Sequence, residues 1–161
     1  MTTETPNTPN VPPQVPPQPL RPEDERTWAA LAHASVLLDL VTGFGGLIGA
    51  LVIWLMYKER SAAVAFHALQ SLVFQGILSV ILIIFVGGTW IVGFIFSFVT
   101  LGFGALVAVP LMFITFGIGV ILGLGGLIYG LYGAYQVYEG RSFRYLWVGD
   151  WLAGQMAARN S

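Results

Sequence analysis

The most constraining feature of this sequence is a stretch of 78 residues, Ser61–Tyr138, that contains no aspartate, glutamate, lysine or arginine. Its ionisable side chains are limited to His67 and several tyrosines. A water-soluble domain of this size needs charged groups on its surface, whereas a lipid bilayer accepts an apolar exterior. Because about 20 apolar residues cross the hydrocarbon core once, the stretch is long enough for two or three crossings. The chain is therefore predicted to be an integral membrane protein whose surroundings are the lipid bilayer.

The composition narrows the fold and the function classes. Continuous apolar runs favour an all-α, polytopic membrane helix bundle over a β-barrel, whose strands would alternate in hydrophobicity. A net charge of −1 argues against a nucleic-acid partner, since phosphate binding needs a basic surface. The absence of cysteine excludes disulfides, thiol nucleophiles and cysteine-based metal sites.

The N-terminal residues 1–26 have a different composition from the rest of the chain. Eight of the nine prolines fall between Pro6 and Pro22, among threonine, asparagine and glutamine. Such a segment cannot bury a core and is predicted to be a disordered, Pro-rich cytoplasmic tail. Its PxxP spacings are interpreted as part of this flexible tail rather than as a ligand for another domain. Residues 27–142 are predicted to form the transmembrane domain.

The distribution of basic residues decides how the chain crosses the membrane. Two short apolar runs, Trp28–Thr42 and Leu47–Tyr57, flank a glycine-rich break and form either a hairpin or one long span. A hairpin followed by two spans places every basic residue on one face, which the positive-inside rule makes cytoplasmic. We therefore predict about four transmembrane helices, with both termini cytoplasmic, in the bacterial cytoplasmic (inner) membrane. The basic residues are Arg21, Arg26, Lys58, Arg60, Arg141, Arg144 and Arg159.

The last two spans are expected at 62–86 and 111–138. Residues 87–109 between them are apolar, and they either extend both helices or form a re-entrant element. A fifth span is disfavoured because it would export the C-terminal arginines. Residues 143–161 are predicted to be an interfacial amphipathic segment, with a short helix at Phe143–Met156.

Five glycines in the last span repeat at spacings of 4, 3, 4 and 3 residues. That average, about 3.5 residues, aligns them along one face of a helix as a bare seam. A helix of this chain, of a second copy in a homo-oligomer, or of another membrane protein is expected to pack closely against it. The glycines are Gly119, Gly123, Gly126, Gly130 and Gly133.

A polar stripe begins the third span, and His33 is expected at a similar depth on the first. Polar groups are costly in lipid, so the stripe is predicted to face the bundle. Three interpretations remain: interhelical hydrogen bonds, the lining of a polar path, or a metal or catalytic site. Two histidines fall short of the ligands of a typical zinc site, so no metal and no cofactor are predicted. The stripe consists of His67, Gln70, Ser71, Gln75 and Ser79.

Asp39 is the single acid within an apolar run. A carboxylate inside a membrane is a functional candidate, but Asp39 lies close enough to the glycine break to bond its backbone instead. The sequence contains no HExxH motif, no P-loop and no nucleophile–base pair in a motif context. The protein is therefore predicted not to be an enzyme.

Several segments together resemble a known family. They are 26–33 (RTWAALAH), 53–61 (IWLMYKERS), 65–75 (AFHALQSLVFQ) and 138–145 (YEGRSFRY). They are similar to small bacterial membrane proteins related to the twenty-kilodalton Tic component of the chloroplast inner-envelope import translocon. The resemblance implies four helices with both ends on one side of the membrane. It also implies that His33, His67 and Gln70 are residues that members of the family tend to keep. It implies an import channel for the plastid members alone. Leu146 departs from the family's Tyr-Pro pattern.

These observations lead to two hypotheses for the function. The first is a non-enzymatic integral membrane protein that acts as a scaffold, a subunit or a translocon-like component through close helix packing. The alternative is a small channel or transporter whose polar path is lined by His33, His67 and Gln70.

Overall fold

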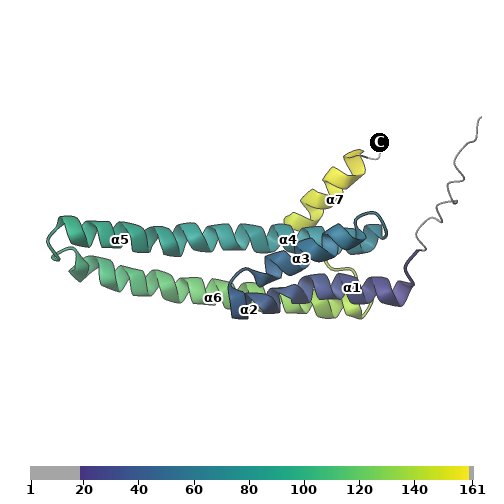
Figure 1. The fold of residues 1–161 in the computed structure, drawn as a ribbon, viewed down its shortest axis with the longest axis horizontal. Helices are drawn as coiled ribbons and strands as arrows, with labels where there is room; N and C mark the ends of the chain where they lie inside the picture. Colours follow the sequence, from purple (N-terminus) through teal and green to yellow (C-terminus); the bar gives the residue numbers. More distant parts are fainter. Residues whose placement is uncertain (1–18, 160–161) are drawn as a thin grey trace, which may run out of the picture.

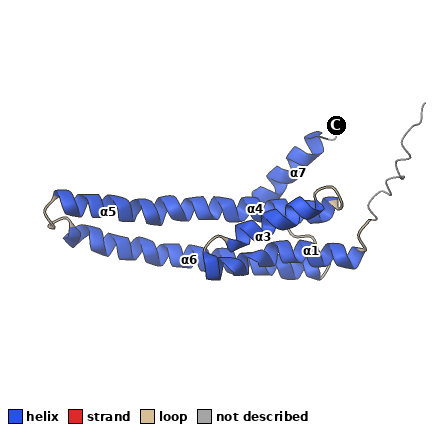
Figure 2. Ribbon diagram, in the orientation of Figure 1, coloured by secondary structure: helices blue, strands red, loops and turns tan. Residues whose placement is uncertain are grey.

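Helices are the only regular secondary structure across residues 19–159, the part of the chain that the computed structural model describes (Figures 1 and 2). Most of the expected N-terminal tail lies outside these residues. Two long antiparallel rods dominate the shape, and a shorter hairpin lies against one half of them (Figure 1). The prediction of an all-α protein is confirmed for the described residues, and the two rods are long and apolar enough to cross a membrane.

The short hairpin is formed by α1 (Pro22–Ala34), a 3-10 turn (Ser35–Leu38), α2 (Asp39–Thr42) and α3 (Gly45–Tyr57). Proline in the first turn and three acidic residues there favour the start of α1. Gly43 ends α2 with a φ of 77°, a left-handed conformation that glycine adopts without strain. The chain therefore reverses at the glycine-rich break, and residues 28–57 are not one long span.

The first rod is continuous from Ala62 to Val99. It comprises α4 (Ala62–Leu82), a π-helical turn η2 (Ile83–Gly87) and α5 (Gly88–Val99). The Ser61 hydroxyl begins α4 by accepting the Val64 amide hydrogen at 3.2 Å. The second rod is α6 (Ala105–Tyr138), and residues 100–104 form the turn between them.

Both rods are longer than the sequence predicted. The helices expected at 62–86 and 111–138 extend through 87–109, so this region consists of helix extensions and one turn rather than a re-entrant element. Pro110 lies inside α6 instead of before its start. Proline cannot donate a backbone hydrogen bond to the preceding turn of a helix. In α6 the residues from Ala105 onward are nevertheless helical before Pro110.

The hairpin packs close to the end of the rods where the charged residues lie. α3 lies along α4, and α1 lies between α4 and α6. The interface is built largely from alanines, because small side chains let helices approach closely. Beyond the hairpin, α5 and the first half of α6 pair with each other alone (Figure 1). The buried alanines are Ala29, Ala30, Ala32, Ala50, Ala65, Ala68 and Ala108.

The five glycines of α6 meet different surroundings. An added Cβ would lie 2.6 Å from Val86 at Gly119, 2.3 Å from Leu78 at Gly126 and 3.0 Å from Val36 at Gly130. At Gly133 it would meet the Phe143 ring at 2.5 Å, whereas at Gly123 nothing lies within 4 Å. Four of these glycines thus face packed side chains of this same chain, and Gly123 faces open space.

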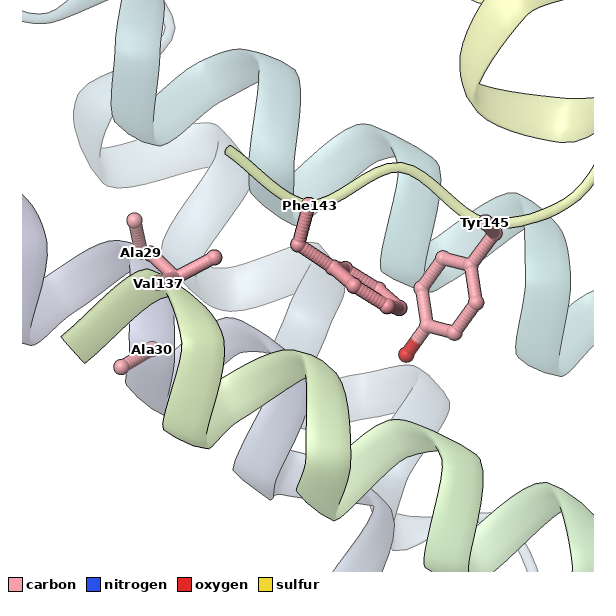
Figure 3. Close-up of a cluster of buried hydrophobic side chains, with 5 residues drawn as sticks. All are labelled: Ala29, Ala30, Val137, Phe143 and Tyr145. Atoms are coloured by element: carbon pink, nitrogen blue, oxygen red, sulfur yellow. The ribbon is translucent and has the colours of Figure 1, made fainter. Parts of the chain in front are cut away.

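The C-terminal segment differs from the expected interfacial helix at Phe143–Met156. Residues 141–145 have no helical structure, and helix α7 (Val148–Arg159) begins only after them. Phe143 and Tyr145 are buried, while Arg144 and Leu146 are exposed, so side chains alternate as on an extended strand. We call residues 141–147 the strap. The strap crosses the bundle. Its side chains Phe143 and Tyr145 pack into the bundle beside Ala29, Ala30 and Val137 (Figure 3).

We expect Gly133→Ala to destabilise the fold by about 1–3 kcal/mol, as overpacking of a filled core does. The new methyl group would overlap the Phe143 ring, which is held by Tyr129, Tyr132, Tyr145 and His33. Denaturant unfolding in detergent micelles measures the effect. Gly123→Ala is the matched control, since its methyl group meets no atom and alanine favours helix. Equal stability of the two variants would contradict the packing described for Gly133.

Candidate functional site

Four polar side chains from three segments meet inside the charged end of the bundle, three of them buried and one, His67, half-buried. His33 comes from α1, His67 and Gln70 from α4, and Tyr145 from the strap. His33 Nε2 lies 3.1 Å from His67 Nδ1, and His33 Nδ1 lies 3.1 Å from the Tyr145 hydroxyl. Gln70 Nε2 lies 2.9 Å from the same His67 Nδ1. We call these four residues the polar clamp, because they join segments that are distant in sequence.

The partners of Gln70 fix the direction of every hydrogen bond in the polar clamp. Its Oε1 accepts the Tyr145 amide hydrogen at 3.4 Å, and its Nε2 donates to the Phe143 carbonyl at 3.3 Å. The nitrogen end of this amide therefore faces His67, so His67 Nδ1 is an acceptor without a proton. His67 Nδ1 has one lone pair, which the donors Gln70 Nε2 and His33 Nε2 share, and His33 Nδ1 accepts the hydroxyl hydrogen of Tyr145. The remaining proton of neutral His67 is on Nε2.

A second polar layer lies one turn further along α4. Ser71 donates its hydroxyl hydrogen to the Ala32 carbonyl at 2.8 Å. The single hydroxyl hydrogen of Ser35 is shared between the Ala32 and Gly46 carbonyls, whose oxygens lie 2.8 and 2.9 Å from Ser35 Oγ. Gln75 Nε2 donates to both serine oxygens, at 3.0 Å to Ser71 and 3.4 Å to Ser35. This layer ties α1, α3 and α4 together, as interhelical hydrogen bonds do in membrane proteins.

Aromatic rings surround the strap side of the polar clamp. The Tyr145 ring stacks on Phe74 with centroids 4.1 Å apart and planes 4° apart. Tyr129 and Phe143 meet it edge-on, at 5.2 and 5.0 Å. Such arrangements suit the ring quadrupoles and exclude water from the hydrogen bonds beside them.

The outer edge of His67 borders a pocket of about 420 Å³ at the charged end. Glu25, Arg26 and Arg141 also line it. Glu25 accepts the Ser61 hydroxyl hydrogen at 2.5 Å, which links the starts of α1 and α4. The guanidinium of Arg26 lies against the turn at Gly140. This pocket lies at the charged end of the bundle and reaches His67, whereas His33 and Gln70 behind it are fully buried.

Asp39 lies apart from the polar clamp, at the reversal of the short hairpin. Its Oδ1 accepts the Gly46 amide hydrogen at 2.7 Å. A carboxylate at this position satisfies a free donor in the first turn of α3 and opposes the positive end of the helix dipole. The structure therefore places Asp39 beside the backbone of the turn and beside Gln75, and not beside His33 or His67.

Tyr145 is a member of the polar clamp that the sequence analysis did not single out. Its side chain is 1% exposed, and burial raises the pKa of its hydroxyl above the ordinary value. The alternation of Phe143, Arg144 and Tyr145 is a strand-like signal, but it is too short to identify a buried strap. Ser35 was also missed, because a serine within an apolar run gives no indication of its partner.

The side chains of the polar clamp offer hydrogen bonding and proton exchange. Across residues 19–159 no three histidine, aspartate or glutamate side chains gather closely enough to hold a metal ion. Neither serine of the second layer has a histidine partner, because each hydroxyl donates to a carbonyl. The arrangement is that of an interhelical connector.

Comparison with protein families matches residues 24–152 to MamF/MmsF, the magnetosome magnetite crystal formation protein family. The match covers the short hairpin, both rods, the strap and the start of α7. The chain belongs to this family. Comparisons with curated proteins and with solved structures give no match. The expected relation to the Tic-like proteins is therefore wrong, because the segments that suggested it lie within the MamF/MmsF match.

Membership in the MamF/MmsF family refines the expected location and function. The sequence predicted a membrane protein. In agreement with this, the family is named for the magnetosome, and this member has two helices long and apolar enough to cross a membrane. Its description names crystal formation rather than an enzymatic reaction. The polar clamp and the second layer both lie within the matched residues.

We expect Tyr145→Phe to cost about 1–3 kcal/mol of stability, because it leaves His33 Nδ1 buried without a donor. Unfolding of the purified protein in detergent micelles measures this. Tyr138→Phe is the matched control, since Tyr138 is 61% exposed and its hydroxyl bonds no clamp residue. A loss no greater than that of the control would show that the bond from Tyr145 to His33 contributes nothing.

Stability is expected to fall as the pH rises above about 10, the ordinary pKa of tyrosine. Folding raises the pKa of Tyr145, so above that pH the folded state keeps a proton that the unfolded state has lost. Raising the pH then favours unfolding. Tyrosinate absorbance of the wild type and of Tyr145→Phe should be equal until the protein unfolds. One additional tyrosine ionising in the folded wild type would contradict the burial.

Proposed function

We propose that this protein is a non-enzymatic structural subunit of the magnetosome membrane that contributes to magnetite crystal formation. The observation that carries the proposal is the polar clamp. Its groups bond one another and the backbone of the strap, so they join three segments of the chain. Family membership supplies the membrane and the process.

The polar clamp supports a structural role because it holds the bundle together at its charged end. Lipid provides no hydrophobic driving force between helices, so association depends on close packing and interhelical hydrogen bonds. The alanine interface supplies the close packing, and the polar clamp and the second layer supply the interhelical hydrogen bonds. The result is a packed base from which α5 and the first half of α6 project (Figure 1).

The arrangement of charges supports both termini on the cytoplasmic side. The Glu25–Ser61 hydrogen bond, the shared pocket of Arg26 and Arg141, and Arg144 over the Phe66 ring place these segments at one end. By the positive-inside rule this end faces the cytoplasm. The turn at residues 100–104 would then face the magnetosome lumen.

The length of the rods supports a strongly tilted orientation. At about 1.5 Å per residue, 38 and 34 residues extend for about 57 and 51 Å, against a hydrocarbon core of about 30 Å. A tilt of about 40°, the upper end of the usual range, reduces the longer rod to about 44 Å along the membrane normal. This equals the thickness of a bilayer with its headgroups.

A channel or transporter is the competing function, with its path through His33, His67 and Gln70. Two of these side chains are 0% exposed, and the bonds of the polar clamp occupy their polar atoms. A conducting path would require breaking several of these bonds together. The structural role is therefore the better supported function.

Deletion of the gene in a magnetite-forming host tests the proposal directly. We expect the number or size of magnetite crystals in electron micrographs to change, and the wild-type gene to restore them. Gln70→Leu, which breaks the polar clamp, should restore crystals only in proportion to its folded amount in the membrane. Unchanged crystals in the deletion strain would overturn the assigned process.

Reconstitution distinguishes the structural role from transport. We expect liposomes with the wild-type protein to pass protons and iron no faster than protein-free liposomes. Flux that is lost in a folded His67→Ala variant would favour the channel instead.

Cysteine labelling tests the orientation, since the chain has no native cysteine. We expect Glu59→Cys and Gln155→Cys to react from the cytoplasmic side and Phe103→Cys from the opposite side. All three positions are exposed. Labelling of positions 59 and 103 from one side would contradict the proposed crossing.

A further inference from the structure

One buried polar atom of the second layer has no hydrogen-bond partner among the described residues: Gln75 Oε1. The amide nitrogen of Gln75 faces the oxygens of Ser35 and Ser71, at 3.4 and 3.0 Å, and the amide oxygen faces away from them. A buried acceptor without a donor is costly, so this oxygen calls for a partner, either a donor or a cation, that the described residues do not supply.

The carboxylate of Asp39 lies beside that oxygen. A Cβ added at Gly46 would lie 2.6 Å from Gln75 Oε1 and 2.8 Å from Asp39 Oδ2. Two atoms at those distances from one point are no more than about 5.4 Å apart. Two oxygens that bind one alkali or alkaline-earth cation at about 2.4 Å each have a separation below that limit. Glycine at position 46 leaves room for both.

These two residues border a cavity of about 190 Å³ between the short hairpin and the rods. Ser79 lines the cavity, as does Gly123, whose missing side chain leaves space on the α6 side. Leucines and a valine form most of the remaining wall, and no lysine or arginine lines it. Among the described residues Asp39 takes part in no ion pair.

We propose that Asp39, Gln75 and Ser79 form a binding site for a monovalent alkali cation of the sodium class. The ligands would be the Asp39 carboxylate and the Gln75 amide oxygen, with the Ser79 hydroxyl. Oxygen ligands suit hard cations. One carboxylate and one monovalent cation give a neutral site, which apolar surroundings favour over the net charge that a divalent ion would leave. The site does not depend on the proposed function.

Thermal unfolding of the purified full chain in detergent micelles tests the site. Sodium chloride replaces N-methylglucamine chloride at constant ionic strength, with potassium chloride and calcium chloride as further arms. A cation that binds only the folded state raises the unfolding midpoint. Above the dissociation constant we expect each tenfold increase in sodium or potassium to raise it by about 3–6 °C.

Two variants remove the site in different ways. Asp39→Asn removes the charge, and Gly123→Leu fills the cavity while it keeps all three ligands. Both should abolish the response to sodium. The matched controls are Asp24→Asn, an acid at the start of α1, and Gly117→Leu, at a position with open space that does not line the cavity. Both controls should retain the full response.

Sodium-23 NMR gives a reading that does not depend on the folding of any variant. Wild-type protein should broaden the sodium line, and potassium chloride should reverse the broadening. Four outcomes would overturn the proposal: no response to sodium or potassium, an equal response in folded Gly123→Leu, a response to calcium alone, or a midpoint that follows pH but not sodium. The last would mean that Asp39 carries a proton.

Discussion

The hydrogen bonds of Gln70 are the interaction on which the rest of this bundle depends. One amide group bonds the strap backbone at two points and, through His67, reaches His33 on α1. In a bilayer no water can replace these partners, so each bond must be made within the protein. The same amide fixes the protonation of both histidines and the direction of the Tyr145 hydroxyl. Three chain segments therefore adopt one arrangement and not several.

This connection explains why one end of the molecule is a packed bundle and the other is a bare helix pair. Polar groups occur along the first half of α4 and its neighbours, and there the helices pack through alanine and glycine. Beyond the short hairpin the side chains are almost wholly apolar and exposed, which suits contact with lipid. A packed base and a long apolar extension together fit the proposed structural role in a membrane, and the family match associates the chain with the magnetosome.

Much of the fold could be predicted from composition and charge, whereas the polar clamp could be predicted only in part. The glycine break at residues 43–46 gave the reversal, because Gly43 adopts a left-handed conformation there. The similar depth expected for His33 and His67 placed them as neighbours, and they are 3.1 Å apart. The sequence did not indicate Tyr145, since the alternation of buried and exposed side chains over residues 143–145 is too short to reveal a period. Nor did the sequence indicate where the two rods end, because uniform hydrophobicity contains no signal for the end of a helix.

The sequence by itself determined the solvent of this protein and the end at which its charges gather. A stretch of 78 uncharged residues can be stable only where water is absent, and this holds for any fold. The tertiary structure alone decided which polar groups satisfy one another. Hydrogen bonds depend on distances of about 3 Å and on donor direction, and residues 112 positions apart, such as His33 and Tyr145, acquire these only when the helices and the strap have packed.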